Sequence, residues 1–309
     1  MPVAKASTEV FTLNDGTKIP AVGLGTWQST DNEAYEAVLF ALKNGYRHID
    51  TAAAYGNEEQ VGKAIKDSGV PRSEIYVTTK LWGTFHQDPE TAIKSSLEKL
   101  GLEYIDLYLI HWPVELNPHG NDPKFPSLPN GKRDIIADSD YTKTYARVQE
   151  LVTKGYTKSV GVSNISVENL TKLLAAPTTK IVPAVNQVEL HPYLPQHKLL
   201  ELTKSKGIYL EAYSPLGSTE SPLFKDETIV KIAKKNDVSP ATILISWAVQ
   251  RGTVVLPKSI TPSRIEDNLK TIKLSEEDFE EINNLHKVVG VKRFINPDWS
   301  PITVFHSDD

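Results

Sequence analysis

The sequence predicts a (β/α)₈ barrel with an N-terminal β-hairpin and a C-terminal tail. Eight short apolar segments alternate with helical patterns, and they begin near Ala21, Tyr46, Ile75, Ile105, Ser159, Ala184, Ile208 and Thr253. Segments this short and this rich in Val, Ile and Leu are typical of buried parallel strands. No linker interrupts the series, so we expect residues 1–309 to form one domain. The alternative, a doubly wound sheet, is disfavoured because Gly23-Leu24-Gly25 lacks the third glycine of a dinucleotide-binding turn.

The individual elements follow from their end signals. Asn14-Asp15-Gly16 predicts a turn between strands over 10–13 and 18–22. Helix starts are marked by Asp88-Pro89, Ser239-Pro240, Thr261-Pro262 and the capping sequence from Ser275 to Asp278. Two connections, 112–140 and 215–225, are longer than the others, and the tail from residue 288 has no periodicity. In a barrel these two connections are βα loops at the face where active sites are built.

Composition excludes several classes of function. The chain carries 39 acidic and 34 basic residues, a net charge of −5, and no block of Lys and Arg, so we expect no nucleic-acid partner. It has no cysteine, which excludes disulfides and thiolate catalysis. No apolar run approaches the roughly 20 residues of a membrane span, and no secretory signal is visible, so a cytoplasmic protein without a membrane partner is expected.

Three neighbouring predicted strands end on ionisable side chains. They are Asp50, Lys80 and His111, and Tyr55 follows in the loop after the first of them. Buried charges are rare unless they are paired, so a shared site is favoured over three separate structural roles. An ammonium beside a phenol favours the phenolate and lowers the phenol's pKa. The set therefore predicts that Tyr55 protonates an oxyanion forming on a carbonyl, with Lys80 held by Asp50. His111 would donate a hydrogen bond to a substrate oxygen or help to relay the proton.

Two further groups predict ligand contacts. Lys258 and Ser259 precede a Pro-started helix that carries Arg264 and Asn268, and cations at this place in a barrel predict a phosphate site. Side chains that could hold and stack on a planar amide ring follow strands five to seven, namely Ser163, Asn164, Gln187, Tyr213 and Ser214. Each of these residues alone is more often a turn former or a cap.

Two other functions stay open. A metal-dependent barrel hydrolase could use as ligands His48, Asp50, His111 and His191. This alternative leaves Tyr55 and Lys80 unexplained. A non-catalytic barrel that binds a nucleotide is the second alternative, and the intact set of ionisable residues argues against it. Serine hydrolysis has little support, because Gly161-Val162-Ser163-Asn164-Ile165 lacks the second glycine of a nucleophile elbow.

Six segments, spread over nearly the whole chain, together resemble the aldo-keto reductases. They are the segment from Gly45 to Glu58, Leu109-Ile110-His111-Trp112-Pro113, Gly161-Val162-Ser163-Asn164, Asn186-Gln187, Tyr213-Ser214-Pro215-Leu216-Gly217 and Leu256-Pro257-Lys258-Ser259. The sequence as a whole is similar to fungal reductases of the glycerol dehydrogenase and ketoreductase type. The resemblance implies a barrel enzyme that reduces aldehydes and ketones, and reversibly oxidises polyols, with Tyr55 as the proton donor. It also implies a monomer.

The resemblance assigns a role to each site residue. The catalytic set is Asp50, Tyr55, Lys80 and His111. The implied cofactor contacts are Thr26, Ser163, Asn164, Gln187, Tyr213, Ser214, Leu216, Ser218, Lys258, Ser259, Arg264 and Asn268. The implied substrate contacts are Trp27, Trp82, His111, Trp112 and Trp299, with Phe294, Asp298 and Phe305 of the tail closing the pocket. Asp267 stands where many relatives carry Glu. The pair of cations, Lys258 and Arg264, favours NADPH over NADH, and no metal is implied.

Overall fold

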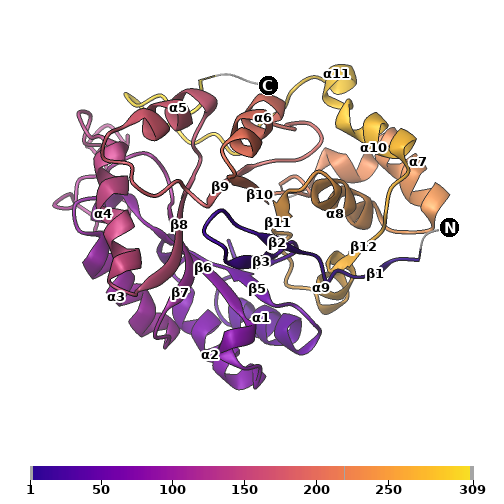
Figure 1. Ribbon diagram of the computed structural model, residues 1–309, viewed down its shortest axis with the longest axis horizontal. Helices are drawn as coiled ribbons and strands as arrows, with labels where there is room; N and C mark the ends of the chain where they lie inside the picture. Colours follow the sequence, from indigo (N-terminus) through magenta and orange to yellow (C-terminus); the bar gives the residue numbers. More distant parts are fainter. Residues whose placement is uncertain (1–2, 219, 307–309) are drawn as a thin grey trace.

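Eight parallel strands form the barrel in the computed structural model, which describes residues 3–218 and 220–306 (Figure 1). In sheet order they are β4 (Leu24–Gly25), β5 (His48–Asp50), β6 (Tyr76–Leu81), β7 (Ile105–Ile110), β8 (Thr157–Ser163), β9 (Val185–Glu189), β10 (Tyr209–Tyr213) and β11 (Val254–Val255). The ring is closed where Gly23 N donates to Val255 O (2.9 Å) and Val255 N donates to Ala21 O (2.8 Å). The predicted (β/α)₈ barrel is confirmed, and each of the eight apolar segments supplies one strand.

Helices surround the barrel (Figure 1). They are α1 (Glu33–Lys43), α2 (Glu58–Ser68), α3 (Pro89–Leu100), α4 (Tyr141–Thr153), α5 (Val167–Ala175), α6 (His197–Ser205), α7 (Glu227–Asn236), α8 (Pro240–Gln250), α9 (Pro262–Asn268), α10 (Glu276–Asn283) and α11 (His286–Val289), with 3₁₀ turns η1 (Ala53–Tyr55), η2 (Arg72–Glu74), η3 (Gly83–Phe85) and η4 (Pro222–Lys225). The caps predicted for α3, α8 and α10 form, because the side chains of Asp88, Ser239 and Ser275 accept hydrogen bonds from first-turn backbone N–H groups. Among the described residues no helix is both long and apolar enough to cross a bilayer.

The N-terminal hairpin closes one end of the barrel. Its strands β2 (Val10–Thr12) and β3 (Lys18–Pro20) pair as predicted. Leu13 and Ile19 are buried in one cluster with apolar side chains of β6, β7, β9 and β11, and Phe11 stacks on Tyr209 with ring centres 5.1 Å apart. One pairing was not predicted: β1 (Lys5–Ala6) lies antiparallel to β12 (Lys270–Thr271). Two-residue strands carry no periodic signal, so sequence alone could not find them.

The opposite end of the barrel receives the strand ends and the long connections. Residues two apart on a strand point to the same side, so His48 and Asp50 of β5 both face the barrel interior, and so do Glu211 and Tyr213 of β10. The loops after β7 and β10 and the tail after α11 meet around this end. The fold therefore brings polar side chains from separate strands into one place and leaves apolar packing to the hairpin end.

We expect Ile19→Ala to lower the free energy of unfolding by about 2–5 kcal/mol, because it leaves a cavity where the hairpin fills the barrel. Ile19 is fully buried, whereas Val10 on the same hairpin is 46% exposed. Val10→Ala is the control and should change the free energy by less than about 0.5 kcal/mol. Urea denaturation measures both. Equal effects of the two substitutions would contradict this account of the hairpin.

Candidate active site

A deep cleft of about 1910 Å³ opens at the C-terminal ends of the strands. Every residue predicted to contact the cofactor lines it: Thr26, Ser163, Asn164, Gln187, Tyr213, Ser214, Leu216, Ser218, Lys258, Ser259, Arg264 and Asn268. The same wall includes Asp50, Tyr55, His111, Trp27, Trp82, Trp112 and Trp299. Lys80 does not reach the surface and lies fully buried beneath the floor. A single small-molecule pocket measures about 300–1,000 Å³, so this cleft has room for a ligand of dinucleotide size and a second molecule.

A buried ion pair occupies the floor of the cleft. Lys80 Nζ donates to Asp50 Oδ1 at 2.7 Å and to the carbonyl oxygen of Thr51 at 2.9 Å. Its third contact is the hydroxyl of Tyr55, 3.4 Å away. Tyr55 ends the short η1 turn that follows β5, and Gly56 leaves this turn with a left-handed φ of 70°. The predicted grouping of the phenol, ammonium and carboxylate is therefore present.

The predicted acidity of Tyr55 is wrong, because burial outweighs the nearby charge of Lys80. Burial raises the pKa of the Tyr55 hydroxyl above its ordinary value of 10.0, and the charge of Lys80 only partly opposes that rise. Burial is the largest single influence on Lys80 and lowers its pKa, but the charge of Asp50, its hydrogen bond and the other acidic groups nearby together raise the pKa above its ordinary value. Tyr55 is therefore a protonated phenol and Lys80 a charged ammonium across the neutral pH range. This is the protonation state that a proton donor requires.

His111 contributes a neutral ring to the same wall. Burial and the nearby charge of Lys80 hold the pKa of His111 well below 6.5. Its ring meets that of Tyr55 edge-on with centres 5.7 Å apart, and that of Trp82 at 5.4 Å. A neutral imidazole can donate one hydrogen bond without adding a second positive charge beside Lys80. His111 is therefore suited to orient a substrate oxygen.

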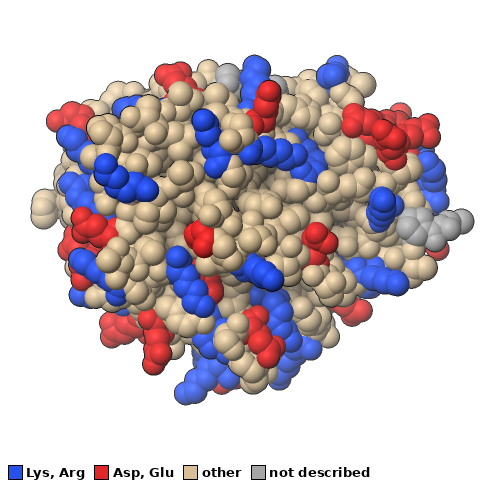
Figure 2. All heavy atoms as spheres, in the orientation of Figure 1, with Lys and Arg blue, Asp and Glu red and all other residues tan. Residues whose placement is uncertain are grey.

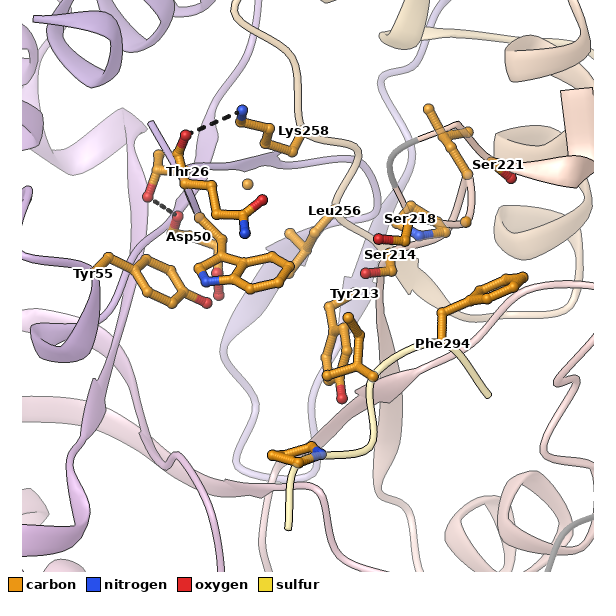
Figure 3. A pocket seen from close by; sticks show the side chains of 18 of the residues that line it. Thr26, Asp50, Tyr55, Tyr213, Ser214, Ser218, Ser221, Leu256, Lys258 and Phe294 are labelled. Carbon is orange, nitrogen blue, oxygen red and sulfur yellow. Dashed lines mark hydrogen bonds between the residues drawn. The ribbon is translucent and has the colours of Figure 1, made fainter. Parts of the chain in front are cut away.

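Tyr213 and its neighbours form a fixed polar wall. The Tyr213 hydroxyl donates to Asn164 Oδ1 at 2.7 Å, which sets the plane of the ring. Asn164 itself adopts a left-handed backbone (φ 59°), a conformation that Asn tolerates better than most residues. Ser163 Oγ donates to Gln187 O at 2.8 Å. Figure 3 shows Tyr55 and Tyr213 entering the cleft from separate segments.

The cationic end of the cleft lies near α9. Lys258 Nζ donates to Gln28 O at 3.5 Å across the cleft, the contact drawn in Figure 3. Within residues 3–218 and 220–306 neither Lys258 nor Arg264 is held in an ion pair. Asp267 is engaged by Ser239 Oγ at 2.6 Å, which is a structural contact. Two exposed cations are therefore available to an anionic ligand.

Thr26 is a buried residue of the cleft wall, directly after β4. Its hydroxyl donates to Asp50 O at 2.9 Å, tying the loop after β4 to the end of β5. Ser214, Leu216 and Ser218 lie on the wall after β10, where Ser214 has a left-handed φ of 47°. A non-glycine residue held in this conformation stores strain of about 1–3 kcal/mol, which is found mainly at functional sites.

Aromatic side chains surround the opening beside Tyr55. Trp82, Trp112 and Trp299 are nearly buried and form one apolar cluster with Val114, Leu116 and Val304. The rings of Trp112 and Trp299 are 5.2 Å apart. Trp27 differs, because it is 42% exposed on the cleft wall. Of the predicted tail residues, Phe294 and Asp298 line the cleft, whereas Phe305 packs on Trp112 at 6.0 Å and lines a second, small pocket.

The tail is held by a buried carboxylate that the sequence analysis missed. Glu189 Oε1 accepts from Phe294 N and Oε2 accepts from Ile295 N, both at 2.8 Å. His191 Nε2 lies 2.8 Å from Glu189 Oε1 on the other side. Glu189 is the last residue of β9, two after Gln187, and that spacing is the signal that would have placed it on the same face.

The metal-ligand set of the hydrolase alternative is not assembled. His48 Nδ1 lies 3.1 Å from Pro20 O, and His191 is engaged by Glu189. In the part of the chain that the structure describes, no three His, Asp or Glu side chains converge as metal ligands. The four residues named for that alternative therefore have separate roles.

Comparisons with known proteins agree with this site. Residues 21–287 match the aldo/keto reductase family. The chain is 57% identical to glycerol 2-dehydrogenase (NADP(+)) of Saccharomyces cerevisiae, covering 97% of each chain, and 47% identical to D-galacturonate reductase of Hypocrea jecorina, covering 93% and 94%. The aldose reductase structure from Schistosoma japonicum superposes with a TM-score of 0.84 at 37% identity, covering 90% of this chain and 92% of that one.

The fold and these matches define a barrel oxidoreductase that uses a nicotinamide cofactor and acts on small carbonyl compounds or alcohols. The chain belongs to the aldo/keto reductase family. The predicted family and the predicted class of enzyme are both confirmed.

We expect Glu189→Gln to loosen the tail, because a glutamine can present only one acceptor oxygen to the two N–H groups of Phe294 and Ile295. Amide hydrogen exchange at those two residues should become about tenfold faster or more. The KM for a carbonyl substrate should rise as well, since the tail lines the cleft. Glu280→Gln on exposed α10 is the matched control. Unchanged exchange at both amides would contradict the anchoring role.

Proposed function

We propose that the protein is an NADPH-dependent carbonyl reductase in which Tyr55 donates the proton. The observation that carries the proposal is the Tyr55 hydroxyl 3.4 Å from the buried Lys80 ammonium, on the wall of a cleft large enough for a dinucleotide. When bound, the reduced nicotinamide supplies the hydride. The chain's own residues position the substrate and provide the proton.

The proton donor works because charge builds up on the substrate oxygen during reduction. Tyr55 Oη is protonated at neutral pH and gives its proton to that oxygen. Lys80 then stabilises the phenolate that remains, because its ammonium lies beside the same oxygen. Asp50 keeps Lys80 in place, and the neutral His111 ring donates a hydrogen bond to the substrate oxygen. In the oxidative direction Tyr55 would have to act as the phenolate, stabilised by Lys80, and accept the proton from an alcohol.

The cleft also supports a choice of cofactor. Gln187, Ser163 and Asn164 would hold the carboxamide of the nicotinamide, and Tyr213 would stack on its ring. Lys258, Ser259 and Arg264 would bind the 2′-phosphate, with Asn268 near the adenine, and Thr26, Ser214, Leu216 and Ser218 would contact the rest of the cofactor. The two exposed cations support NADPH over NADH, because only NADPH carries that phosphate.

The substrate site would be the aromatic opening beside Tyr55. Trp27, Trp82, Trp112 and Trp299 would contact the substrate there, and they suit aldehydes and ketones with an apolar part. Two relatives named for glycerol and D-galacturonate support polyols and sugar acids as further candidates. A single domain, a monomer and a cytoplasmic location remain predictions, and light scattering and cell fractionation test the last two.

Tyr55→Phe tests the proton donor. We expect NADPH oxidation with a panel of aldehydes and ketones to fall by about 10²–10⁴-fold, the usual contribution of a general acid. NADPH binding, followed by fluorescence quenching, should persist. Tyr35→Phe removes an exposed tyrosine hydroxyl that contacts Asp67 and serves as the control. Wild-type turnover by Tyr55→Phe would refute the assignment, and a wild-type protein inactive on the whole panel would favour a non-catalytic barrel.

Lys258→Ala and Arg264→Ala test the cofactor preference. Each removes a cation, so we expect NADPH affinity to fall by about 10- to 100-fold, the range for a hydrogen bond to a charged group. NADH affinity should change little. Lys231→Ala, which removes an exposed lysine paired with Glu281, is the control. Equal losses for both cofactors in titration calorimetry would show that these residues do not bind the 2′-phosphate.

A further inference from the structure

A buried carboxyl group beneath the cleft has no part in the mechanism above. Glu211 lies in the middle of β10 and is fully buried. One of its oxygens, Oε2, accepts from Gln187 Nε2 at 2.8 Å. The same Gln187 nitrogen donates to Asp50 Oδ2 at 2.8 Å. Gln187 thus gives both of its amide hydrogens to two carboxyl groups in the barrel, and its amide oxygen is left for the cleft.

The other oxygen of Glu211 indicates how the acid is protonated. Oε1 lies 3.4 Å from His48 Nε2 and accepts no hydrogen bond within the described residues. His48 Nδ1 lies 3.1 Å from the carbonyl oxygen of Pro20, which can only accept, so the ring proton belongs on Nδ1. The imidazole Nε2 facing Glu211 is then an acceptor, and the Thr78 hydroxyl, 3.5 Å from the same nitrogen, is a second and longer contact. A neutral carboxylic acid at position 211 satisfies this geometry by donating its O–H to His48, whereas a carboxylate would be buried with an unsatisfied oxygen.

We propose that Glu211 is a positioning residue that, as a neutral acid bridging His48 and Gln187, fixes the Gln187 amide with its oxygen toward the nicotinamide. The proposal rests on the function proposed above. Without the acceptor at position 211, one hydrogen of the Gln187 amide loses its partner and the amide is free to turn about its last torsion. The carboxamide of the cofactor would then face the Gln187 amide in two orientations, one with the amide oxygen and one with the amide nitrogen toward it.

The surroundings of Glu211 agree with a neutral acid. Burial raises the pKa of Glu211 to about 8, and the negative charge of Asp50 adds to that rise. The other groups facing it titrate elsewhere: burial lowers the pKa of His48 to about 4, while the pKa of Tyr76, Tyr55 and Lys80 lies above their ordinary values. Burial raises the pKa of Asp50 as well, but its ion pair with Lys80 and its hydrogen bond from Gln187 oppose that rise, whereas Glu211 has no ion pair with a lysine or arginine among the described residues. Between pH 6.5 and pH 9.5, therefore, we expect Glu211 to be the group in this cluster that loses a proton.

Two substitutions separate a positioning role from a merely structural one. Glu211→Gln reproduces the neutral acid, since its amide oxygen accepts from Gln187 and its NH₂ donates to His48. Glu211→Leu removes both contacts. We expect Glu211→Leu to weaken NADPH binding about tenfold, the value of one lost hydrogen bond of about 1.4 kcal/mol, and Glu211→Gln to restore affinity to within about twofold. Equal NADPH affinity in Glu211→Leu and the wild type would overturn the proposal.

A fragment of the cofactor provides the matched probe. 2′-Phospho-ADP-ribose lacks the nicotinamide, so its affinity should be the same in Glu211→Leu and the wild type. The double variant Glu211→Leu/Gln187→Leu should bind NADPH no more weakly than Gln187→Leu, because Glu211 acts only through Gln187. Additive losses in the double variant, or a parallel loss for the fragment, would overturn the proposal. Failure of the wild type to bind NADPH would instead refute the proposed function.

The pH dependence of cofactor binding is a further test, and it does not require the Glu211→Leu variant to fold. Above pH 8 a negative charge at Glu211 should favour the cationic ring of NADP⁺ over the neutral ring of NADPH. The ratio of the NADPH to the NADP⁺ dissociation constant should therefore rise between pH 7 and pH 9.5 in the wild type and stay flat in Glu211→Gln. The 2′-phosphate is common to both forms and cancels in the ratio. The same rise in Glu211→Gln would overturn the proposal.

Leu107→Ala controls for lost stability in the barrel. Leu107 is fully buried in the apolar cluster under the site. Its removal should lower the unfolding temperature but leave NADPH affinity within about twofold. A tenfold loss of NADPH affinity in Leu107→Ala would mean that any weakened barrel loses the cofactor, which would overturn the specific role of Glu211.

Discussion

The buried ion pair between Asp50 and Lys80 is the interaction on which the site depends. Burying two charges costs several kcal/mol per ion unless each is paired and hydrogen-bonded. Here Lys80 has three oxygen neighbours, from Asp50, Thr51 and Tyr55, and the second oxygen of Asp50 accepts from Gln187. Two of the neighbours that satisfy the pair, Tyr55 and Gln187, also line the cleft. The need to compensate these charges therefore fixes the positions of Tyr55 and Gln187, for which we propose the roles of proton donor and nicotinamide contact.

A division of charge between the floor and the rim follows from this pair. On the floor, His111 is neutral, and a neutral Glu211 leaves Lys80 and Asp50 as one charge of each sign. A net charge there would be costly, because the surrounding barrel excludes water. The cations available to an anionic ligand, Lys258 and Arg264, lie instead at the exposed rim, where water solvates them. On the face seen in Figure 2, acidic and basic side chains are interspersed, as in an ordinary solvated surface.

The sequence predicted the features that depend on short periodic patterns. The eight strands, the caps at Asp88 and Ser239, and the meeting of strand-end residues in one cleft follow from alternation and from parallel topology. The pKa direction of Tyr55 could not be predicted, because it depends on how far burial outweighs one nearby charge. The roles of Glu189 and Glu211 were missed for a related reason. The role of a carboxyl group within a strand can be assigned only when its partner across the barrel is known.

The tail and Tyr55 are held by separate parts of the structure. Glu189 binds it through the backbone N–H groups of Phe294 and Ile295, and backbone groups are present whatever the side chain. The tail can therefore carry different side chains over the cleft while keeping its anchor. Trp299 meets Trp112 and Trp82 from this position, whereas Tyr55 is held from the other side by Lys80. Tyr55 is thus fixed by the barrel. The shape of the aromatic opening depends on the tail, which the barrel holds through Glu189.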